Sequence, residues 1–229
     1  MLRETLERQE TFSTFGMLHL LCMTPDMFRF YFKASDERLV DQVFSERGDE
    51  RWCEDVAEEF FAAVKTALVV EAWYEEVPED MICENFGVGV GDIHAVVENL
   101  RWLMHAAWRI TQTFAPRFDV EVRNLEIRIE NGVKEELLPL IELRGIGRVR
   151  ARWLFNRGIT TPEALLTTDP RELVPVLGTV LTKNIVEQAA KKTGKTAEMP
   201  DLLEERTESV PAVAIADQKP QKTLFDFGE

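Results

Sequence analysis

The sequence predicts an all-α protein: a helical bundle, then a small helix-hairpin-helix domain and a disordered tail. Segments 58–76 and 92–114 carry apolar residues at helical spacing. Helix starts with proline in the first turn, and glycine stops, recur along the chain. With 229 residues and 45% hydrophobic content, the chain can bury a real core. We expect the bundle over residues 1–118, the hairpin domain over 119–195 and the tail over 196–229.

Each element of the first domain has its own local signal. The sequence TPD at 24–26 is typical of a helix start with proline in the first turn. The segment 58–76 predicts a long helix with a buried apolar face, made of Phe61, Val64, Ala67, Leu68, Ala72 and Trp73. A short helix over 79–85 ends at Gly87, and Asp92 caps the long helix that follows.

The second domain begins less clearly and then becomes regular. Residues 123–129 alternate weakly, which fits a short strand or, as we favour, a helix leading into the hairpin. Segments 161–163 and 169–170 each place a capping side chain before a proline. Val176-Leu177-Gly178 precedes a last helix through Lys192, so this part resembles a degenerate second hairpin packed on the first. Beyond Gly194 the periodicity stops, which indicates disorder.

The most informative stretch is LRGIGRVRARWLFNRG, residues 143–158. Gly145 and Gly147 would let the turn reach positive φ and bring backbone N–H groups close to a ligand, at the positive end of the second helix. Such a turn is an anion site. The arginines around it are Arg144, Arg148, Arg150 and Arg152. We therefore expect a phosphodiester to be gripped without regard to base sequence. The alternative is an ordinary helical hairpin with a solvated basic face.

The formal net charge of −14 is unevenly spread. Residues 1–115 carry net −12, residues 116–195 carry net +3, and residues 196–229 carry net −5. Between Pro139 and Gly158 there are five arginines and a single acidic residue, Glu142. A local positive patch thus survives on an acidic protein, and DNA binding should be weak and strongly dependent on salt.

A second functional signal lies on the helix over 92–114. Its apolar stripe comprises Ile93, Val96, Val97, Leu100, Leu103, Met104, Ala107, Ile110 and Phe114. Trp102 falls about 180° from Ile93 at 100° per residue, with Ala95 and Arg109 on the same line. A tryptophan there either packs against another domain or offers an aromatic plane to an unpaired base, and Arg109 could hold a phosphate. The basic hairpin favours nucleic acid.

The third signal is the terminal sequence QKTLFDFGE. It has the spacing of a sliding-clamp peptide, in which a glutamine anchors and one helical turn presents apolar plugs to a pocket. The residues at those positions are Gln221, Leu224, Phe225 and Phe227. Gly228 stands where the usual peptide has a second aromatic residue, which predicts reduced affinity for a sliding clamp (PCNA).

Other kinds of site find little support. Cys22, Cys53 and Cys83 are widely spaced and predict buried thiols, and no histidine falls at zinc-ligand spacing with a cysteine. The chain has no membrane-spanning run and no signal peptide at its start, so we expect a cytoplasmic protein without a membrane partner.

Four separated blocks resemble the C-terminal part of the archaeal DNA-repair helicases of superfamily two, kin to HelQ and to the helicase of polymerase theta. The blocks are GMLHLLCMTPDM (16–27), VKTALVVEAWYEE (64–76), ICENFGVGVGDI (82–93) and GVKEELLPLIELRGIGRVRARWLFNRGI (132–159). They occur in the order found in that family, and together the resemblance covers about residues 12–192. The RVRAR run is specific.

The resemblance implies a 3′-to-5′ ATP-dependent helicase acting at stalled forks. A helical ratchet domain would line the pore, and the hairpin domain would brake and grip single-stranded DNA. Trp102 matches the ratchet tryptophan that stacks on a base, whereas Ala95 replaces the family's arginine one rank before it. Arg148, Arg150 and Arg152 match the family's basic motif.

The sequence contains no G-x-x-x-x-G-K-[ST] loop and has no room for two nucleotide-binding domains. We expect no cofactor in this chain, with ATP and Mg²⁺ belonging to separate motor domains, and no ATP hydrolysis by the chain alone. The favoured interpretation is the part of such a helicase that binds single-stranded or forked DNA. A stand-alone, clamp-tethered DNA-binding adaptor is the alternative, and a hairpin-containing nuclease or glycosylase is remote because a catalytic lysine and aspartate are missing at the hairpin.

Overall fold

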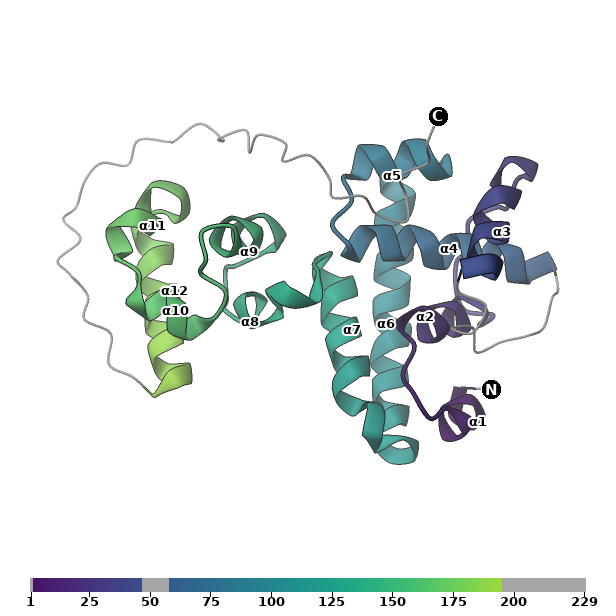
Figure 1. Ribbon diagram of the computed structural model, residues 1–229, viewed down its shortest axis with the longest axis horizontal. Helices are drawn as coiled ribbons and strands as arrows, with labels where there is room; N and C mark the ends of the chain where they lie inside the picture. Colours follow the sequence, from purple (N-terminus) through teal and green to yellow (C-terminus); the bar gives the residue numbers. More distant parts are fainter. Residues whose placement is uncertain (1, 47–57, 195–229) are drawn as a thin grey trace. The chain divides into compact units, whose positions relative to one another are not determined.

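The computed structural model describes residues 2–46 and 58–194, and every regular element in these two ranges is helical. The predicted all-α class is confirmed for this part of the chain (Figure 1). The chain divides into two compact units, Met1–Leu138 and Pro139–Glu229. The predicted tail and the predicted clamp peptide lie outside the described residues.

The first unit is a helical bundle built around one long helix, α6 (Val90–Phe114). Its elements are α1 (Leu2–Arg8), α2 (Thr14–Cys22), η1 (Ala34–Asp36), α3 (Glu37–Glu46), α4 (Glu58–Tyr74), α5 (Glu79–Phe86), α6 (Val90–Phe114), η3 (Pro116–Phe118), α7 (Asp119–Asn131) and η4 (Glu135–Leu137). Helices α6 and α7 run side by side in opposite directions, joined by η3 (Figure 1). Helices α1, α2 and α4 pack on α6, so α6 is the central element of the unit.

The predicted helices α4, α5 and α6 form where their periodicity indicated. The apolar face of α4 is buried from Val64 to Trp73, and α5 ends at Gly87 as expected. Helix α6 begins two residues before Asp92, with Gly89 at the N-cap. Asp92 is instead the third helical residue, where its carboxylate accepts from the Gly89 N–H at 3.3 Å.

The prediction of a helix start at Thr24-Pro25 is wrong, because this sequence follows the end of α2. The Thr24 hydroxyl donates to the Leu21 carbonyl at 2.7 Å. The Arg29 guanidinium donates to the carbonyls of Cys22 and Thr24 at 3.2 and 2.8 Å. The bonds to Leu21 and Cys22 satisfy carbonyl groups at the C-terminal end of α2, so the Thr24 side chain caps the preceding helix.

Residues 28–33, here called the aromatic strap, have no regular secondary structure and lie against α4 and α6. Helix side chains replace the missing backbone partners: the Phe30 N–H donates to Thr66 Oγ1 at 3.0 Å. Lys65 Nζ, which is buried, donates to the Tyr31 carbonyl at 3.2 Å and pairs with Asp36 at 2.7 Å. The strap is therefore held by a buried ion pair whose two charges satisfy one another.

Residues 123–129 are helical, as favoured, and belong to α7. The Trp73 indole N–H donates to the Ile129 carbonyl at 2.9 Å, which ties α4 to α7. Gly132 ends α7 at φ +62°, and a Cβ there would lie 2.6 Å from the Trp73 ring. Because α7 packs along α6 within the first unit, the two units divide after Leu138, whereas the sequence suggested a boundary at residue 118.

The second unit contains five helices in its described part. They are α8 (Leu138–Ile141), α9 (Arg148–Phe155), α10 (Pro162–Thr167), α11 (Pro170–Leu177) and α12 (Thr179–Thr193). Thr161 and Asp169 cap α10 and α11 through side-chain bonds of 3.2 and 2.9 Å, as predicted. Helix α12 packs on α10 and α11 and follows α11 directly at Gly178 (Figure 1).

Candidate nucleic-acid interface

The exposed face of α6 is the first candidate surface, and it lies within the first unit. Helix α6 buries its apolar stripe from Ile93 to Ala107. At the far end Phe114 is exposed, and the Arg3 guanidinium covers its ring at 4.4 Å. Ala95, Trp102 and Arg109 are all exposed, and the Trp102 side chain keeps 64% of its surface accessible. The predicted line of three residues therefore faces away from the core of its unit.

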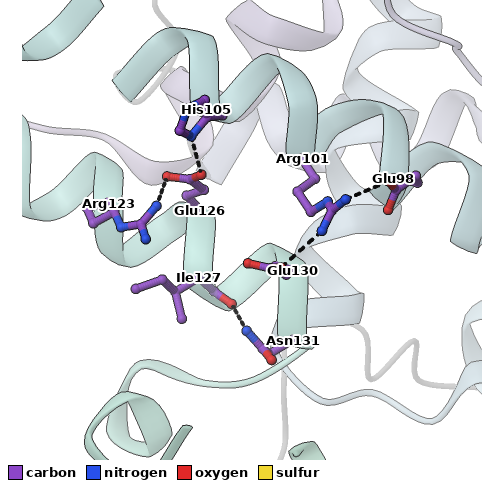
Figure 2. Close-up of polar contacts among 8 residues, drawn as sticks. All are labelled: Glu98, Arg101, His105, Arg123, Glu126, Ile127, Glu130 and Asn131. Atoms are coloured by element: carbon purple, nitrogen blue, oxygen red, sulfur yellow. Dashed lines mark hydrogen bonds and ion pairs between the residues drawn. The ribbon is translucent and has the colours of Figure 1, made fainter. Parts of the chain in front are cut away.

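Ion pairs to α7 border one flank of this face (Figure 2). Arg101 lies between Glu98, at 2.8 Å, and Glu130, at 3.1 Å. The hydrogen bond to Glu130 and the charge of Glu98 raise the pKa of Arg101 above its already high value, so it remains a cation. His105 Nδ1 lies 3.1 Å from the buried carboxylate of Glu126.

Arginine side chains on this surface differ in how far their charge is compensated. Arg123 shares the Glu126 carboxylate with His105, at 2.6 Å, and its guanidinium lies 4.7 Å above the Trp108 ring. Arg109 instead donates to the neutral amide oxygen of Gln112 at 3.2 Å. A phosphate approaching Trp102 thus meets in Arg109 a cation whose hydrogen-bond partner carries no opposing charge.

The glycine turn between α8 and α9 is the second candidate surface, in the second unit. Gly145 adopts φ +93°, but Gly147 has φ −104°, so the expectation of positive φ at both glycines is wrong for Gly147. Gly147 is the N-cap of α9, and its carbonyl accepts from the Ala151 N–H at 2.9 Å. The buried side chain of Ile146 anchors the turn between the two glycines.

The arginines of the turn occupy distinct positions. Arg144 is exposed, and Arg150 is exposed while donating to the Gly145 carbonyl at 2.8 Å. Arg148 and Arg152 are half-buried, and the Arg152 guanidinium lies 5.1 Å above the Phe155 ring. Arg150 therefore stabilises the turn through its bond to Gly145, a structural role that its position in the sequence did not indicate.

Helix α12 holds the turn in place through residues that the sequence analysis missed. The side-chain amide of Gln188 accepts from the Arg144 N–H at 2.8 Å and donates to the Arg144 carbonyl at 3.2 Å. A Cβ on Gly145 would lie 2.6 Å from Leu181 Cδ1. A glutamine on an exposed helix face carries no sequence signal for such a contact. The sequence predicted only that the later helices pack on the hairpin.

The structure thus groups the predicted residues into two sets. Trp102 and Arg109 share a face of α6, and the four predicted arginines and two glycines gather at one turn. Cys22 is buried, and burial raises the pKa of its thiol to about 12. Among the described side chains, no three His, Cys, Asp or Glu residues come together as a metal site. No helix in the described ranges is long and apolar enough to cross a membrane.

Comparison with known proteins identifies the family of the chain. A family model described as "Archaeal helicase, domain 4" matches residues 15–132. The ATP-dependent DNA helicase Hel308 of Methanocella arvoryzae is 34% identical, over 98% of this chain and 30% of its own length. Hel308 of Pyrococcus horikoshii is 38% identical over 79% of this chain, and that of Pyrococcus abyssi is 33% identical over 84%. These two alignments cover 26% and 28% of the relatives, so the chain spans under a third of the curated proteins it matches.

Proposed function

Because this chain belongs to the archaeal Hel308 family of DNA helicases, as part of their C-terminal region, we propose that it holds single-stranded or forked DNA for such a helicase. One observation carries the proposal. Trp102 is 64% exposed in the middle of a 25-residue helix whose opposite face forms the core of its unit. An exposed indole, with the weakly compensated Arg109 about two helical turns away on the same face of α6, suits a base and a nearby phosphate.

The turn between α8 and α9 supplies a second grip in this proposal. Backbone N–H groups at the start of α9 and the surrounding arginines would bind phosphates, because a helix N-terminus attracts anions and guanidinium groups match phosphate geometry. Phosphate contacts position a nucleic acid without reading its sequence. Trp102 would then engage successive bases, and the turn would resist slipping of the strand.

The ATP-driven motor would be formed by separate motor domains. The sequence has no Walker-type phosphate loop, so ATP and Mg²⁺ would bind to motor domains that translocate 3′ to 5′ along the strand at stalled replication forks and draw it past Trp102. For this chain assayed by itself, DNA binding is the measurable activity. The alternative role, an adaptor without motor activity, would show the same binding but no coupling to an ATPase.

The test replaces Trp102 with alanine and measures affinity for an oligothymidylate by fluorescence anisotropy. Loss of one base–aromatic stack should weaken binding by about 1 to 3 kcal/mol. Trp102→Phe should retain part of the affinity, and Thr113→Ala, at an exposed position on the same helix, is the matched control. Unchanged affinity of a folded Trp102→Ala protein would instead assign the indole to packing against another domain.

A further inference from the structure

Phe28 is an exposed aromatic residue whose backbone is nevertheless fixed. Its side chain keeps 52% of its surface accessible, and its N–H donates to Asn99 Oδ1 on α6 at 2.8 Å. The Phe30 ring meets the Phe28 ring edge-on, with 6.1 Å between centroids. Phe30 itself is buried and bonded to Thr66. Phe28 is therefore presented to solvent by a strap whose backbone is bonded to both α6 and α4.

The anchoring bond places the Phe28 backbone at Asn99, about one turn of α6 before Trp102. Asn99 precedes Trp102 by three positions on α6, and residues with that spacing are neighbours on a helix surface, about 5 to 6 Å apart. At 100° per residue, Asn99 lies about 60° around the helix from Trp102, on the side away from Glu98. Glu98 marks the flank of ion pairs with α7. The exposed face of α6 thus has α7 along one flank and the aromatic strap along the other.

The chemistry around the two rings favours nucleic acid over a protein partner. A protein-docking core is apolar and depleted in charge. Apart from Ala106, the exposed or half-buried α6 residues around Trp102 are polar: Glu98, Asn99, Arg101, His105 and Arg109. Aromatic planes alternating with cations are typical of surfaces that bind unpaired strands, since every base has a face to stack.

We propose that Phe28 is a second stacking contact for single-stranded nucleic acid, receiving a base next to the one held by Trp102. This rests on the proposed function of α6. The bonds to Asn99 and Thr66 hold the strap before a strand arrives, so little backbone freedom is lost on binding. Ala95, at the rank before Trp102, offers only a methyl group, and the Phe28 backbone is bonded to α6 at Asn99, between Ala95 and Trp102.

The experiment measures oligothymidylate binding by the full chain carrying Phe28→Ala, Phe28→Tyr or Tyr31→Ala. Phe28→Ala should weaken binding roughly 5- to 150-fold, the loss expected for one stack, with an unchanged salt dependence because no phosphate contact is removed. Phe28→Tyr should restore the affinity. Tyr31→Ala is the matched control: Tyr31 is 81% exposed in the same strap, but its carbonyl is bonded to Lys65 on α4.

Photocrosslinking of the unmodified protein gives a readout that does not depend on mutant folding. An oligonucleotide carrying 5-iododeoxyuridine should attach to the peptide that contains Phe28, as well as to the one that contains Trp102. This proposal is overturned if Trp102→Ala weakens DNA binding while Phe28→Ala does not. It is also overturned if Phe28→Ala weakens binding no more than Tyr31→Ala does. In either case a loss of binding in Trp102→Ala would still support base stacking on α6. If neither Trp102→Ala nor Phe28→Ala changes affinity and no crosslink forms, the proposed function fails as well.

Discussion

At the scale of single residues, the two glycines of the turn allow a matched comparison. Gly145→Ala should destabilise the second unit by about 1 to 3 kcal/mol, because φ +93° is strained for alanine and the new methyl group meets Leu181. Gly147→Ala should cost less than about 1 kcal/mol, because φ is −104° and a Cβ there has open space. Urea unfolding of both variants measures the difference.

The same pair separates folding from binding. Gly147→Ala adds a methyl group at the start of α9, where a phosphate would approach the backbone, so a stable variant with weaker DNA binding supports the proposed contact. Equal destabilisation by the two substitutions would contradict the distinct roles assigned here to Gly145 and Gly147.

Cys22 gives a prediction about reactivity and pH. Burial raises the pKa of its thiol from 9.0 to about 12, and the nearby Arg29 opposes this only in part. The thiolate is the reactive form, so in a Cys53→Ser variant a thiol reagent at pH 8 should modify Cys83 and spare Cys22 until the protein unfolds. The stabilising effect of the neutral thiol is fully present below about pH 9 and is lost as the pH rises toward 12. Rapid modification of both thiols in the native protein would show that Cys22 is accessible.

At the scale of elements, α9 carries the predicted phosphate grip. Changing Arg148, Arg150 and Arg152 together to alanine should weaken single-stranded DNA binding and lower the salt slope by about one per lost phosphate contact. Arg171→Ala, at an exposed position on α11 of the same unit, is the control and should leave the slope unchanged. Titration at several salt concentrations measures the slope. An unchanged slope in the folded triple variant would support the alternative, in which these arginines form a solvated basic face and do not contact phosphates.

The elements also show how far sequence reasoning extends. Periodicity predicted α4 and α6 because each buries a continuous apolar stripe, and the same periodicity placed Trp102 on the exposed face. The signal at Thr24 misled because a hydroxyl beside a helix end can cap the helix before it as well as one after it. The aromatic strap could not be predicted, because its bonds to Asn99 and Thr66 join residues far apart in the chain.

At the scale of the whole molecule, the excess of acidic residues is confined to residues 1–115 and 196–229. The candidate turn lies in the segment 116–195, which has a net charge of +3, whereas residues 1–115 carry −12. Composition and spacing were therefore enough to predict the residues of the turn. The division after Leu138 could not be predicted in this way, because it depends on α7 packing along α6 rather than on any break in the sequence.

The terminal peptide gives a prediction for the assembled system. A peptide of residues 215–229 should bind an archaeal sliding clamp with micromolar affinity, about −8 kcal/mol, since Gly228 replaces an aromatic residue of the usual pattern. Leu224→Ala with Phe227→Ala should abolish the heat of binding in calorimetry while leaving the DNA affinity of the full chain unchanged. No heat at high peptide concentration, and no competition with a known clamp ligand, would contradict the prediction that residues 221–228 bind a sliding clamp.

The anchoring of the glycine turn by α12 also sets an order of events during synthesis. The ribosome makes Arg144 and Gly145 long before Leu181 and Gln188, which pack on the turn and bond its backbone. A nascent chain that ends before Leu181 lacks the contacts that hold the turn in its final shape. The arginine-rich turn therefore reaches its final shape only after α12, as far as Gln188, has left the exit tunnel, so its binding shape is delayed until the helices behind it can pack.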